Sequence, residues 1–447
     1  MKIIIAGAGA VGTHLAKLLS RERNDITLID KDPYRLEGIS SNFELLTICG
    51  EPSSIAVLKE AEVARADLFI GVTPDEAHNM TCCMLASKLG AKKTVARVDN
   101  AEYVLPEHRD FFKTVGIDSI IYPEMLAGRE IIHNIRRSWV RQWIEIQGGA
   151  LLILGLKIRA GAPLLDTPLK ELCQPDSPYH IVAVKRRGET VIPHGDDVVL
   201  DGDVVYFMTT PPYVETIKEA AGKADYPEVR SIFIMGGGDT TVQALQMLPP
   251  SIHAKVIETD FHRCEELGEL VDNSRVMIFH GDGRDLDLLR EEGISRAGAF
   301  AALTDNSEMN ILACLAAKSL GVMKTLAMIE NLDYVNMAES LDIGSIINKK
   351  AFTASHIYQM MLKADVTNMK TLTVANADVA EFQVKEGMKI TKKPVRDLGL
   401  PSTVTLGGLV RDGQGYLING DTVIQPGDTV TAFCLQNTVQ KLEKFFK

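Results

Sequence analysis

The sequence predicts an α/β protein in which two doubly wound parallel-sheet domains alternate with two small α+β domains. Three observations lead to this prediction: the first half of the chain returns in the second half, short apolar runs alternate with longer segments of helical period, and a glycine-rich turn follows the first apolar run. The chain has 447 residues, of which 46% are hydrophobic and 24% charged. At roughly 150 residues per domain, several folded domains are expected.

The repeat has the order A-B-A-B. The A units share KLGAKKTVARVDNAEYV (88–104) with SLGVMKTLAMIENLDYV (319–335), and KIIIAGAGAVGTHL from residue 2 corresponds to SIFIMGGGDTTVQAL from residue 231. The B units share TPLKEL (167–172) with KPVRDL (393–398), and HGDDVVLDGDVV (194–205) with NGDTVIQPGDTV (419–430). A repeat of this length defines the architecture. We therefore expect domains at residues 1–123, 139–223, 229–350 and 368–447.

The A and B units differ in their strand patterns. In the first A unit, apolar runs predict buried strands at 3–6, 26–29, 68–72 and 94–98. Nearly continuous apolar runs are typical of parallel strands that carry helices on both faces of the sheet. Each B unit has Val- and Thr-rich strands separated by Gly-Asp pairs, which predict turns in preference to a cation site. These pairs are Gly195-Asp196, Gly202-Asp203, Gly420-Asp421 and Gly427-Asp428.

The pattern Gly7-x-Gly9-x-x-Gly12 lies between the first apolar run and a helical segment. Glycines at this spacing permit a tight turn, a close approach of the backbone to a pyrophosphate, and close helix–strand packing. The first amides of the helix attract the anion. Asp30 ends the second run, where a carboxylate accepts hydrogen bonds from an adenosine ribose. The sequence thus predicts a Rossmann-like nucleotide site made of Gly7, Ala8, Gly9, Ala10, Val11, Gly12 and Asp30.

The second A unit carries a modified turn. Thr241 replaces the third glycine, and Glu258 replaces Asp30. The β-branched Thr241 is expected to push the helix away from the strand, whereas its hydroxyl could contact a phosphate. A carboxylate in both copies disfavours the 2′-phosphate of NADP(H), so NAD(H) or an adenine nucleotide is favoured. The candidate residues are Gly236, Gly237, Gly238, Asp239, Thr240, Thr241 and Glu258.

Further polar residues follow the strands, at the edge where open α/β sheets bind ligands. Arg97 ends the fifth strand and could neutralise a phosphate, but Met328 takes its place in the second copy, so the two pockets differ electrostatically. Thr73 and Thr304 are equally compatible with helix caps. The candidate residues are Gly50, Glu51, Thr73, Asn79 and Arg97 in the first copy and Gly281, Asp282, Thr304 and Asn310 in the second.

Composition disfavours several classes of protein. The 48 Lys and Arg against 59 Asp and Glu give a net charge of −11, which repels a nucleic-acid backbone. The seven cysteines include no Cys-x-x-Cys pair, so we expect reduced cytosolic thiols, with Cys82 and Cys83 buried on a helix. Charged residues interrupt every apolar run before the ~20 residues of a membrane helix, so no transmembrane segment is expected. No metal site is expected.

Motifs for catalysis are missing. The chain has no Tyr-x-x-x-Lys, His-Glu-x-x-His, Gly-x-Ser-x-Gly or Walker-type motif. Binding without turnover is therefore the favoured class, so we expect a protein that is not an enzyme. An NAD-dependent oxidoreductase is the alternative, and consumption of NADH with carbonyl substrates would distinguish it.

The two tryptophans, Trp139 and Trp143, stand four residues apart beside Arg136, Arg137 and Arg141. This spacing predicts one face of a helix. Aromatic and arginine side chains are enriched at interfaces, so the face is either a partner contact or a cover over the neighbouring core. The sequence leaves both open.

The combined motifs resemble the regulator-of-potassium-conductance family of KTN/RCK domains. The shared features are the glycine-rich turn with a late acid, a Gly-acid pair after the third strand, Thr-x-x-x-x-x-Asn after the fourth, and a β-rich unit with Gly-Asp-x-Val. Two such modules in tandem are similar to the regulatory subunits of Trk-type bacterial potassium uptake systems. The resemblance implies two Rossmann-like RCK N-terminal domains, each followed by an RCK C-terminal domain.

The resemblance also implies a function. It implies a non-catalytic cytoplasmic protein, peripheral on the inner face of the cell membrane, that forms a homotetramer beneath a Trk-type potassium-translocating membrane subunit. NAD(H), or ATP or ADP as an alternative ligand, is implied to bind the residues named above and to change the shape of a ring that gates the transporter. A nucleotide-sensing ring of another channel or exchanger is the alternative. If Asp30 binds the ribose, Asp30→Ala weakens nucleotide binding and leaves the fold intact.

Overall fold

The computed structural model describes residues 1–20, 24–40, 45–331, 333–364, 369–374, 377–435, 442 and 444–446. The chain divides into two compact units. Unit 1 contains residues 1–133, 230–335 and 346–365, and unit 2 contains residues 134–229, 336–345 and 366–447. The predicted domain boundary at residue 368 lies outside the described residues, and the four-domain division stays a prediction.

The first sheet of unit 1 has the strand order β3-β2-β1-β4-β5-β6, and its neighbouring strands run parallel. This is the doubly wound Rossmann order. The predicted runs are strands to within one residue at each end. The strands are β1 (Lys2–Ala6), β2 (Asp25–Asp30), β3 (Leu46–Cys49), β4 (Leu68–Gly71), β5 (Thr94–Arg97) and β6 (Ser119–Ile121). The helices are α1 (Ala10–Leu19), α2 (Pro33–Ser40), α3 (Ile55–Glu60), α4 (Glu76–Leu89), α5 (Arg109–Thr114) and α6 (Pro123–Arg136).

Both faces of this sheet are buried, which explains why its strands are apolar throughout. Ile3 and Ile5 face a core that contains Leu15 of α1, whereas Ile4 faces a core with Cys82 and Cys83 of α4. Burial raises the pKa of the Cys82 thiol to about 12 and that of Cys83 still further, so neither is a reactive thiolate near neutral pH. The prediction of two buried helix cysteines is confirmed.

The second sheet of unit 1 repeats the first, with the order β14-β13-β12-β15-β16-β17. Its strands are β12 (Ser231–Met235), β13 (His253–Glu258), β14 (Val276–His280), β15 (Ala299–Ala302), β16 (Lys324–Met328) and β17 (Ser345–Ile347). Its helices are α9 (Asp239–Gln246), α10 (Phe261–Leu270), α11 (Leu286–Glu291), α12 (Ser307–Ser319), α13 (Asp333–Ser340) and α14 (Lys349–Ala364).

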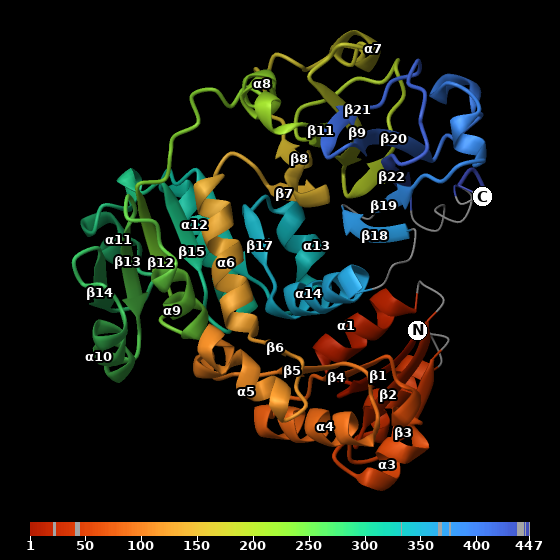
Figure 1. Ribbon diagram of the computed structural model, residues 1–447. Coiled ribbons are helices and arrows are strands. Elements are labelled where there is room, and N and C mark those ends of the chain that lie inside the picture. The colour runs from red at the N-terminus through yellow and green to blue at the C-terminus, as the bar shows by residue number, and fades with distance from the viewer. Residues whose placement is uncertain are drawn as a thin grey trace. The chain divides into compact units, whose positions relative to one another are not determined.

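The last helix of each copy packs against the first helix of the other copy. Ala354 and Ile357 of α14 belong to the same core as Leu15 of α1, and the two helices lie side by side (Figure 1). In the reciprocal contact, a Cβ on Gly128 of α6 would lie 2.9 Å from the backbone nitrogen of Ala244 in α9. Because each copy completes the core of the other, the two Rossmann-like sheets form one unit.

Unit 2 contains two antiparallel sheets, with the orders β10-β9-β11-β8-β7 and β18-β19-β22-β20-β21. The elements of the first B unit are β7 (Gln142–Ile146), β8 (Leu151–Lys157), α7 (Leu169–Leu172), β9 (Tyr179–Arg186), β10 (Glu189–Val191), β11 (Val204–Thr209) and α8 (Val214–Ala220). Those of the second are β18 (Met369–Val374), β19 (Ala377–Gln383), β20 (Val404–Arg411), β21 (Gln414–Leu417) and β22 (Thr429–Leu435). The fold class predicted from the sequence is confirmed.

The two sheets of unit 2 share a core. Val182 and Met208 of the first sheet pack in the same cluster as Val379 and Phe433 of the second. A Cβ on Gly407 would lie 2.7 Å from the sulfur of Met208, so a larger residue here would require the Met208 side chain to shift.

The Gly-Asp pairs are turns, as predicted, but two of their aspartates are buried. Asp203 is 2% exposed and receives hydrogen bonds from both Nε and Nη2 of Arg186, at 2.9 and 2.7 Å. Asp428, 1% exposed, forms the equivalent pair with Arg411 at 2.7 and 2.8 Å. These pairs hold the turns against strands β9 and β20.

The prediction that Trp139 and Trp143 share a helix is wrong. Helix α6 ends at Arg136, and Trp143 lies in β7, whose partner strand is β8. Both rings pack against the core of the first B unit, which agrees with the interpretation that they cover a neighbouring core. The guanidinium of Arg137 lies 3.7 Å from the ring centroid of Trp143.

In the part of the chain that the structure describes, no helix combines the length and the apolar character needed to cross a bilayer.

Candidate functional site

The first candidate site lies at the carboxyl ends of β1 and β2. Gly7 directly follows β1 and has a φ of +111°, a conformation that favours glycine. The amide of Ala8 donates a 2.6 Å hydrogen bond to Oδ2 of Asp30, and the amide of Asp32 donates one of 2.9 Å to Oδ1. The carboxylate therefore holds the turn as well as facing the site. Asp30 is 6% exposed, so its removal is expected to weaken the fold, contrary to the expectation that Asp30→Ala leaves the fold intact.

The three glycines of the turn have different roles. A Cβ on Gly12 would lie 1.9 Å from the carbonyl oxygen of Gly7, so only glycine lets α1 approach β1 this closely. A Cβ on Gly9 meets nothing within 4 Å, and Gly9 is the N-cap of α1 without a side-chain cap. Helix geometry leaves the amides of Ala10, Val11 and Gly12 without intrahelical acceptors. The space beside Gly9 and these amides form a cradle suited to a phosphate.

Thr73 and Asn79 connect β4, β5 and α4. The side-chain nitrogen Nδ2 of Asn79 donates to the carbonyl oxygens of Thr73 and Arg97, both at 2.9 Å. Its side-chain oxygen accepts from the amide and the hydroxyl of Thr73, at 2.8 and 2.7 Å. All four hydrogen-bonding positions of the Asn79 side chain are used by protein groups, so the side chain fixes this edge, and its contact with a nucleotide stays a prediction. The helix caps are Asp75 and Asn306, so the interpretation of Thr73 and Thr304 as caps is wrong.

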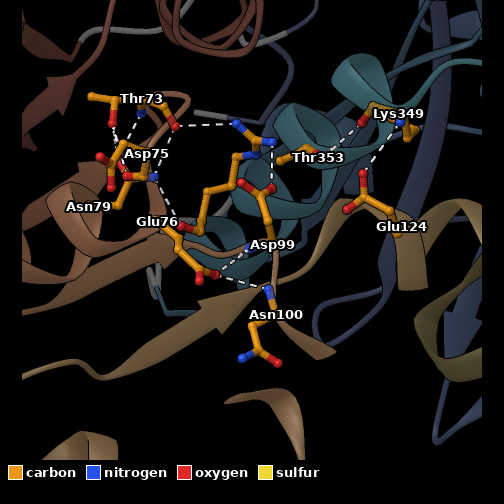
Figure 2. A network of polar contacts seen from close by, with 10 residues as sticks. Thr73, Asp75, Glu76, Asn79, Asp99, Asn100, Glu124, Lys349 and Thr353 are labelled. Atoms are coloured by element: carbon orange, nitrogen blue, oxygen red, sulfur yellow. Dashed lines mark hydrogen bonds and ion pairs between the residues drawn. The ribbon is translucent and has the colours of Figure 1, made fainter. Parts of the chain in front are cut away.

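Arg97 lies at the end of β5 in a polar network, and Figure 2 labels Thr73, Glu76 and Asp99 of this network. Its Nη1 donates to the carbonyl oxygen of Thr73 at 3.2 Å, and its Nη2 pairs with Asp99 at 2.6 Å. Nε is buried and has no partner among the described residues. Glu76 accepts hydrogen bonds from the amides of Asp99 and Asn100, at 2.8 and 2.9 Å. The Arg97 guanidinium is therefore held at the edge, but not all of its N–H donors are hydrogen-bonded.

Sequence reasoning missed Glu76, Asp99 and Glu124. Glu124 of α6 pairs with Lys349 of α14 at 3.3 Å, and its Oε2 is buried without a partner in the described chain (Figure 2). The aligned segments RVDNAEYV and MIENLDYV carry an acid followed by Asn at the same place, which is a signal for Asp99. Pairs such as Glu124–Lys349 join distant segments and leave no local pattern.

Gly50 and Glu51 follow β3, as expected. A Cβ on Gly50 would lie 2.6 Å from a methyl group of Val57, so its role includes packing of α3. Oε1 of Glu51 lies 2.7 Å from Nε2 of His78 in α4. His78 is a further residue of the edge that the sequence did not indicate.

The second copy builds a similar edge with different contacts. The hydroxyl of Thr241 donates a 2.6 Å hydrogen bond to the carbonyl oxygen of Gly236, so it is engaged within the turn and not directed at a phosphate. The amide of Gly237 donates to Oε2 of Glu258 at 2.6 Å, as Ala8 does to Asp30. Asn310 makes the same four contacts as Asn79, with Thr304 and with the carbonyl oxygen of Met328.

The pKa of Glu258 lies below its usual value. Burial by itself would raise it, but the amides of Asp260 and Gly237 and the hydroxyl of Thr259 donate to the carboxylate and favour its charged form.

The helix that follows the second turn begins with an acid. Asp239 occupies the position of Ala10 and pairs with Arg263 at 2.7 Å. Nε of Arg263 also donates to the carbonyl oxygen of Gly237 at 2.7 Å, and its Nη1 pairs with Glu266 at 2.9 Å. A carboxylate at the first turn of α9 stands where a phosphate would approach. The second turn is thus less favourable to a phosphate than the first.

A cavity of about 1140 Å³ opens over the second edge. Its lining includes Gly236, Gly237, Gly238, Glu258, Asp282, Thr304, Tyr334 and Lys350, together with Ala10 from the first copy. Asp282, which follows β14 and Gly281, pairs with Arg284 at 2.6 Å. Thr240 is 3% exposed and Val11 is 8% exposed, so both side chains are buried, and Val11 belongs to the core of the first sheet. Among the described residues, no group of three or more His, Cys, Asp or Glu side chains could hold a metal ion.

Two Rossmann-like sheets with a glycine-rich turn at the same edge, together with two antiparallel sheets, define a tandem Rossmann-type protein with paired small domains. Residues 3–123 and 232–349 match the TrkA-N domain, and residues 153–222 and 379–447 match the TrkA-C domain. The chain therefore belongs to the TrkA family, and the predicted family resemblance is confirmed.

The relatives match along the whole chain. The Trk system potassium uptake proteins TrkA of Azorhizobium caulinodans and Halomonas elongata are each 30% identical, over 100% of this chain and 99% of theirs. The TrkA homolog of Archaeoglobus fulgidus is 29% identical over 100% of both chains. Among solved structures, the GsuK RCK domain is 17% identical with a TM-score of 0.57 and covers 100% of this chain and 94% of its own. The GsuK channel bound to NAD has a TM-score of 0.58 at 17% identity, covers 100% of this chain and 78% of its own, and shows the same fold.

Proposed function

We propose that this protein is a nucleotide-sensing regulatory subunit of a potassium uptake system, with its main NAD(H) site at the first turn. The observation that carries the proposal is the cradle at Gly7, Gly9 and Gly12, where helix α1 approaches β1 to a distance that only Gly12 permits. Full-length relatives named as potassium uptake proteins support the transport assignment.

The residues of the first copy fit a dinucleotide. The amides of Ala10, Val11 and Gly12 would hold the pyrophosphate at the positive end of α1. Asp30 would accept the adenosine ribose, since a carboxylate has about four acceptor positions and the amides of Ala8 and Asp32 use two of them. Arg97 provides a cation at the same edge, and Gly50, Glu51 and Thr73 complete the rim. ATP or ADP would use the same phosphate cradle.

The second copy is proposed to bind nucleotide more weakly. Asp239 brings a negative charge to the phosphate position, and the hydroxyl of Thr241 is already engaged with Gly236. Met328 offers no cation where the first copy has Arg97. The cavity over the second edge is large enough for a ligand, so its weaker affinity would come from charge and not from space.

The nucleotide is proposed to act by shifting the shape of an assembly. In this proposal four copies form a ring on the cytoplasmic side of a Trk-type membrane subunit, and the ring changes shape on binding NAD(H), ATP or ADP. A ligand shifts such an equilibrium only when it binds the two shapes with different affinity. A difference of about 1–3 kcal/mol changes the populations roughly 5- to 150-fold. No turnover of the nucleotide is needed.

Calorimetry with NADH, NAD, ATP and ADP tests this function. Asp30→Asn is expected to weaken binding at least tenfold and to blunt potassium uptake in cells, whereas the matched Glu258→Gln in the second copy is expected to have a smaller effect. Asp30→Ala, which also leaves the buried amide of Ala8 unpaired, is expected to destabilise unit 1 as well. Unchanged affinity in Asp30→Asn removes Asp30 from the site. Steady consumption of NADH with carbonyl substrates would overturn the non-catalytic proposal.

A further inference from the structure

Three basic side chains pair with one carboxylate in unit 2. Asp342, in the turn between α13 and β17, pairs with the guanidinium groups of Arg141 and Arg159 and lies 3.1 Å from Nζ of Lys157. Asp342 itself has a φ of +55°, so its backbone is held in the left-handed conformation.

The charges of this cluster do not balance. Three cations and one carboxylate leave two positive charges, and in the described part of unit 2 no second carboxylate pairs with Arg141, Lys157 or Arg159. A guanidinium has five N–H groups, but each arginine uses a single nitrogen on Asp342. The other N–H groups are donors of the kind that bind oxyanions.

The cluster is partly removed from water, which strengthens its field. The side chains of Arg141, Lys157 and Asp342 are 23%, 18% and 20% exposed, whereas Arg159 is 50% exposed and leaves the cluster open to solvent. Burial alone would raise the pKa of Asp342, but Arg159 and Arg141 lower it well below its usual range. Asp342 thus stays charged as the built-in anion.

We propose that Arg141, Lys157 and Arg159 form an oxyanion socket that binds a phosphate group, with the Asp342 carboxylate as its intrinsic, competing occupant. Phosphate is the favoured class because a tetrahedral dianion accepts from several guanidinium and ammonium groups at once and offsets more of the excess charge than a carboxylate does. The phosphate would come from a free anion or from a lipid headgroup. This site is separate from the nucleotide turns, so it does not depend on the proposed function.

The test uses the full-length protein with NAD present in every sample. Phosphate binding is measured by titration calorimetry at constant ionic strength, with chloride as the balancing anion. Asp342→Asn is expected to bind phosphate at least tenfold more tightly than the unmodified protein, and Arg159→Gln at least tenfold more weakly. Asp412→Asn is the matched control, since Asp412 is an exposed aspartate with a φ of +49° in the β20–β21 turn, and it is expected to leave the affinity unchanged.

A second comparison and a vesicle-binding measurement complete the test. If circular dichroism shows that Asp342→Asn is unfolded, the phosphate affinity of Arg159→Gln is compared with that of the unmodified protein, and this comparison tests the proposal. Vesicles of phosphatidylcholine with and without phosphatidic acid separate the sources, because binding that Arg159→Gln abolishes assigns the phosphate to a lipid headgroup. Equal phosphate affinity in the unmodified protein, Asp342→Asn and Arg159→Gln, with no vesicle binding, overturns the proposal.

Discussion

The hydroxyl of Thr241 donates a 2.6 Å hydrogen bond to the carbonyl oxygen of Gly236, at a turn whose counterpart in the first copy has no room for a side chain. In the first copy, a Cβ on Gly12 would lie 1.9 Å from the carbonyl oxygen of Gly7. The two copies therefore share a fold but hold their first helices differently. The first turn carries no side chain at this position, whereas the second carries a hydroxyl that is bonded to the turn itself.

Gly12→Ala is expected to destabilise the protein by about 1–3 kcal/mol, because the added methyl group overlaps backbone atoms that cannot move aside. Gly9→Ala is its matched control: φ is −70° and the space is open, so the melting temperature is expected to stay unchanged. NADH affinity is expected to fall in both variants, since each methyl group disturbs the phosphate cradle. Scanning calorimetry and binding titrations measure the two effects. An unchanged melting temperature in Gly12→Ala contradicts this account of the turn.

Glu258 predicts a pH dependence of stability. Its pKa in the folded protein lies below the usual value for a glutamate, so the charged form stabilises the fold above the usual value, and this contribution is lost as the pH falls through the lower folded pKa. Glu258→Gln is therefore expected to reduce the loss of stability between about pH 5 and pH 3, measured as the urea midpoint. Glu269→Gln, at an exposed glutamate of α10, should retain the full loss. Identical pH profiles for the two variants would falsify the assignment.

Two aspartates of the Gly-Asp turns are expected to differ sharply. Asp203→Asn breaks a buried pair with Arg186, and we expect a loss of about 2–3 kcal/mol, less than the 3–5 of a fully buried pair because Arg186 is 40% exposed. Asp196, 90% exposed and paired with Lys170, is the control, and Asp196→Asn is expected to leave the denaturation midpoint unchanged. Equal effects of the two changes on chemical denaturation would contradict a stabilising role of the buried Asp203–Arg186 pair.

Gly128 and Gly268 test the packing of α6 on α9. Gly128→Ala is expected to destabilise unit 1 by about 1–3 kcal/mol, because its Cβ would lie 2.9 Å from the backbone of Ala244. Gly268→Ala, in open space on α10, is expected to stabilise the protein by about 0.5–1 kcal/mol through helix propensity. The two variants should shift the melting temperature in opposite directions. A stabilising Gly128→Ala excludes close α6–α9 packing.

The predicted fold and site followed from local patterns. The strand–turn–helix at Gly7 to Gly12 and the acid at Asp30 are close in sequence and so could be recognised without coordinates. The helix predicted for Trp139 and Trp143 failed because their spacing of four also suits a chain that leaves α6 and enters β7, where pairing with β8 decides. The partners of Asp203 and Glu124, namely Arg186 and Lys349, come from other strands and helices.

By itself, the sequence determined the repeat, the fold class and the glycines of the first turn, because these depend on periodicity and on backbone conformations that few residues adopt. Only the tertiary structure decided which charges meet. It placed Asp342 among Arg141, Lys157 and Arg159, engaged Thr241 within its own turn, and packed α14 against α1. The physical reason is that electrostatic and packing energies depend on distances in space, which chain spacing does not set when residues come from different elements.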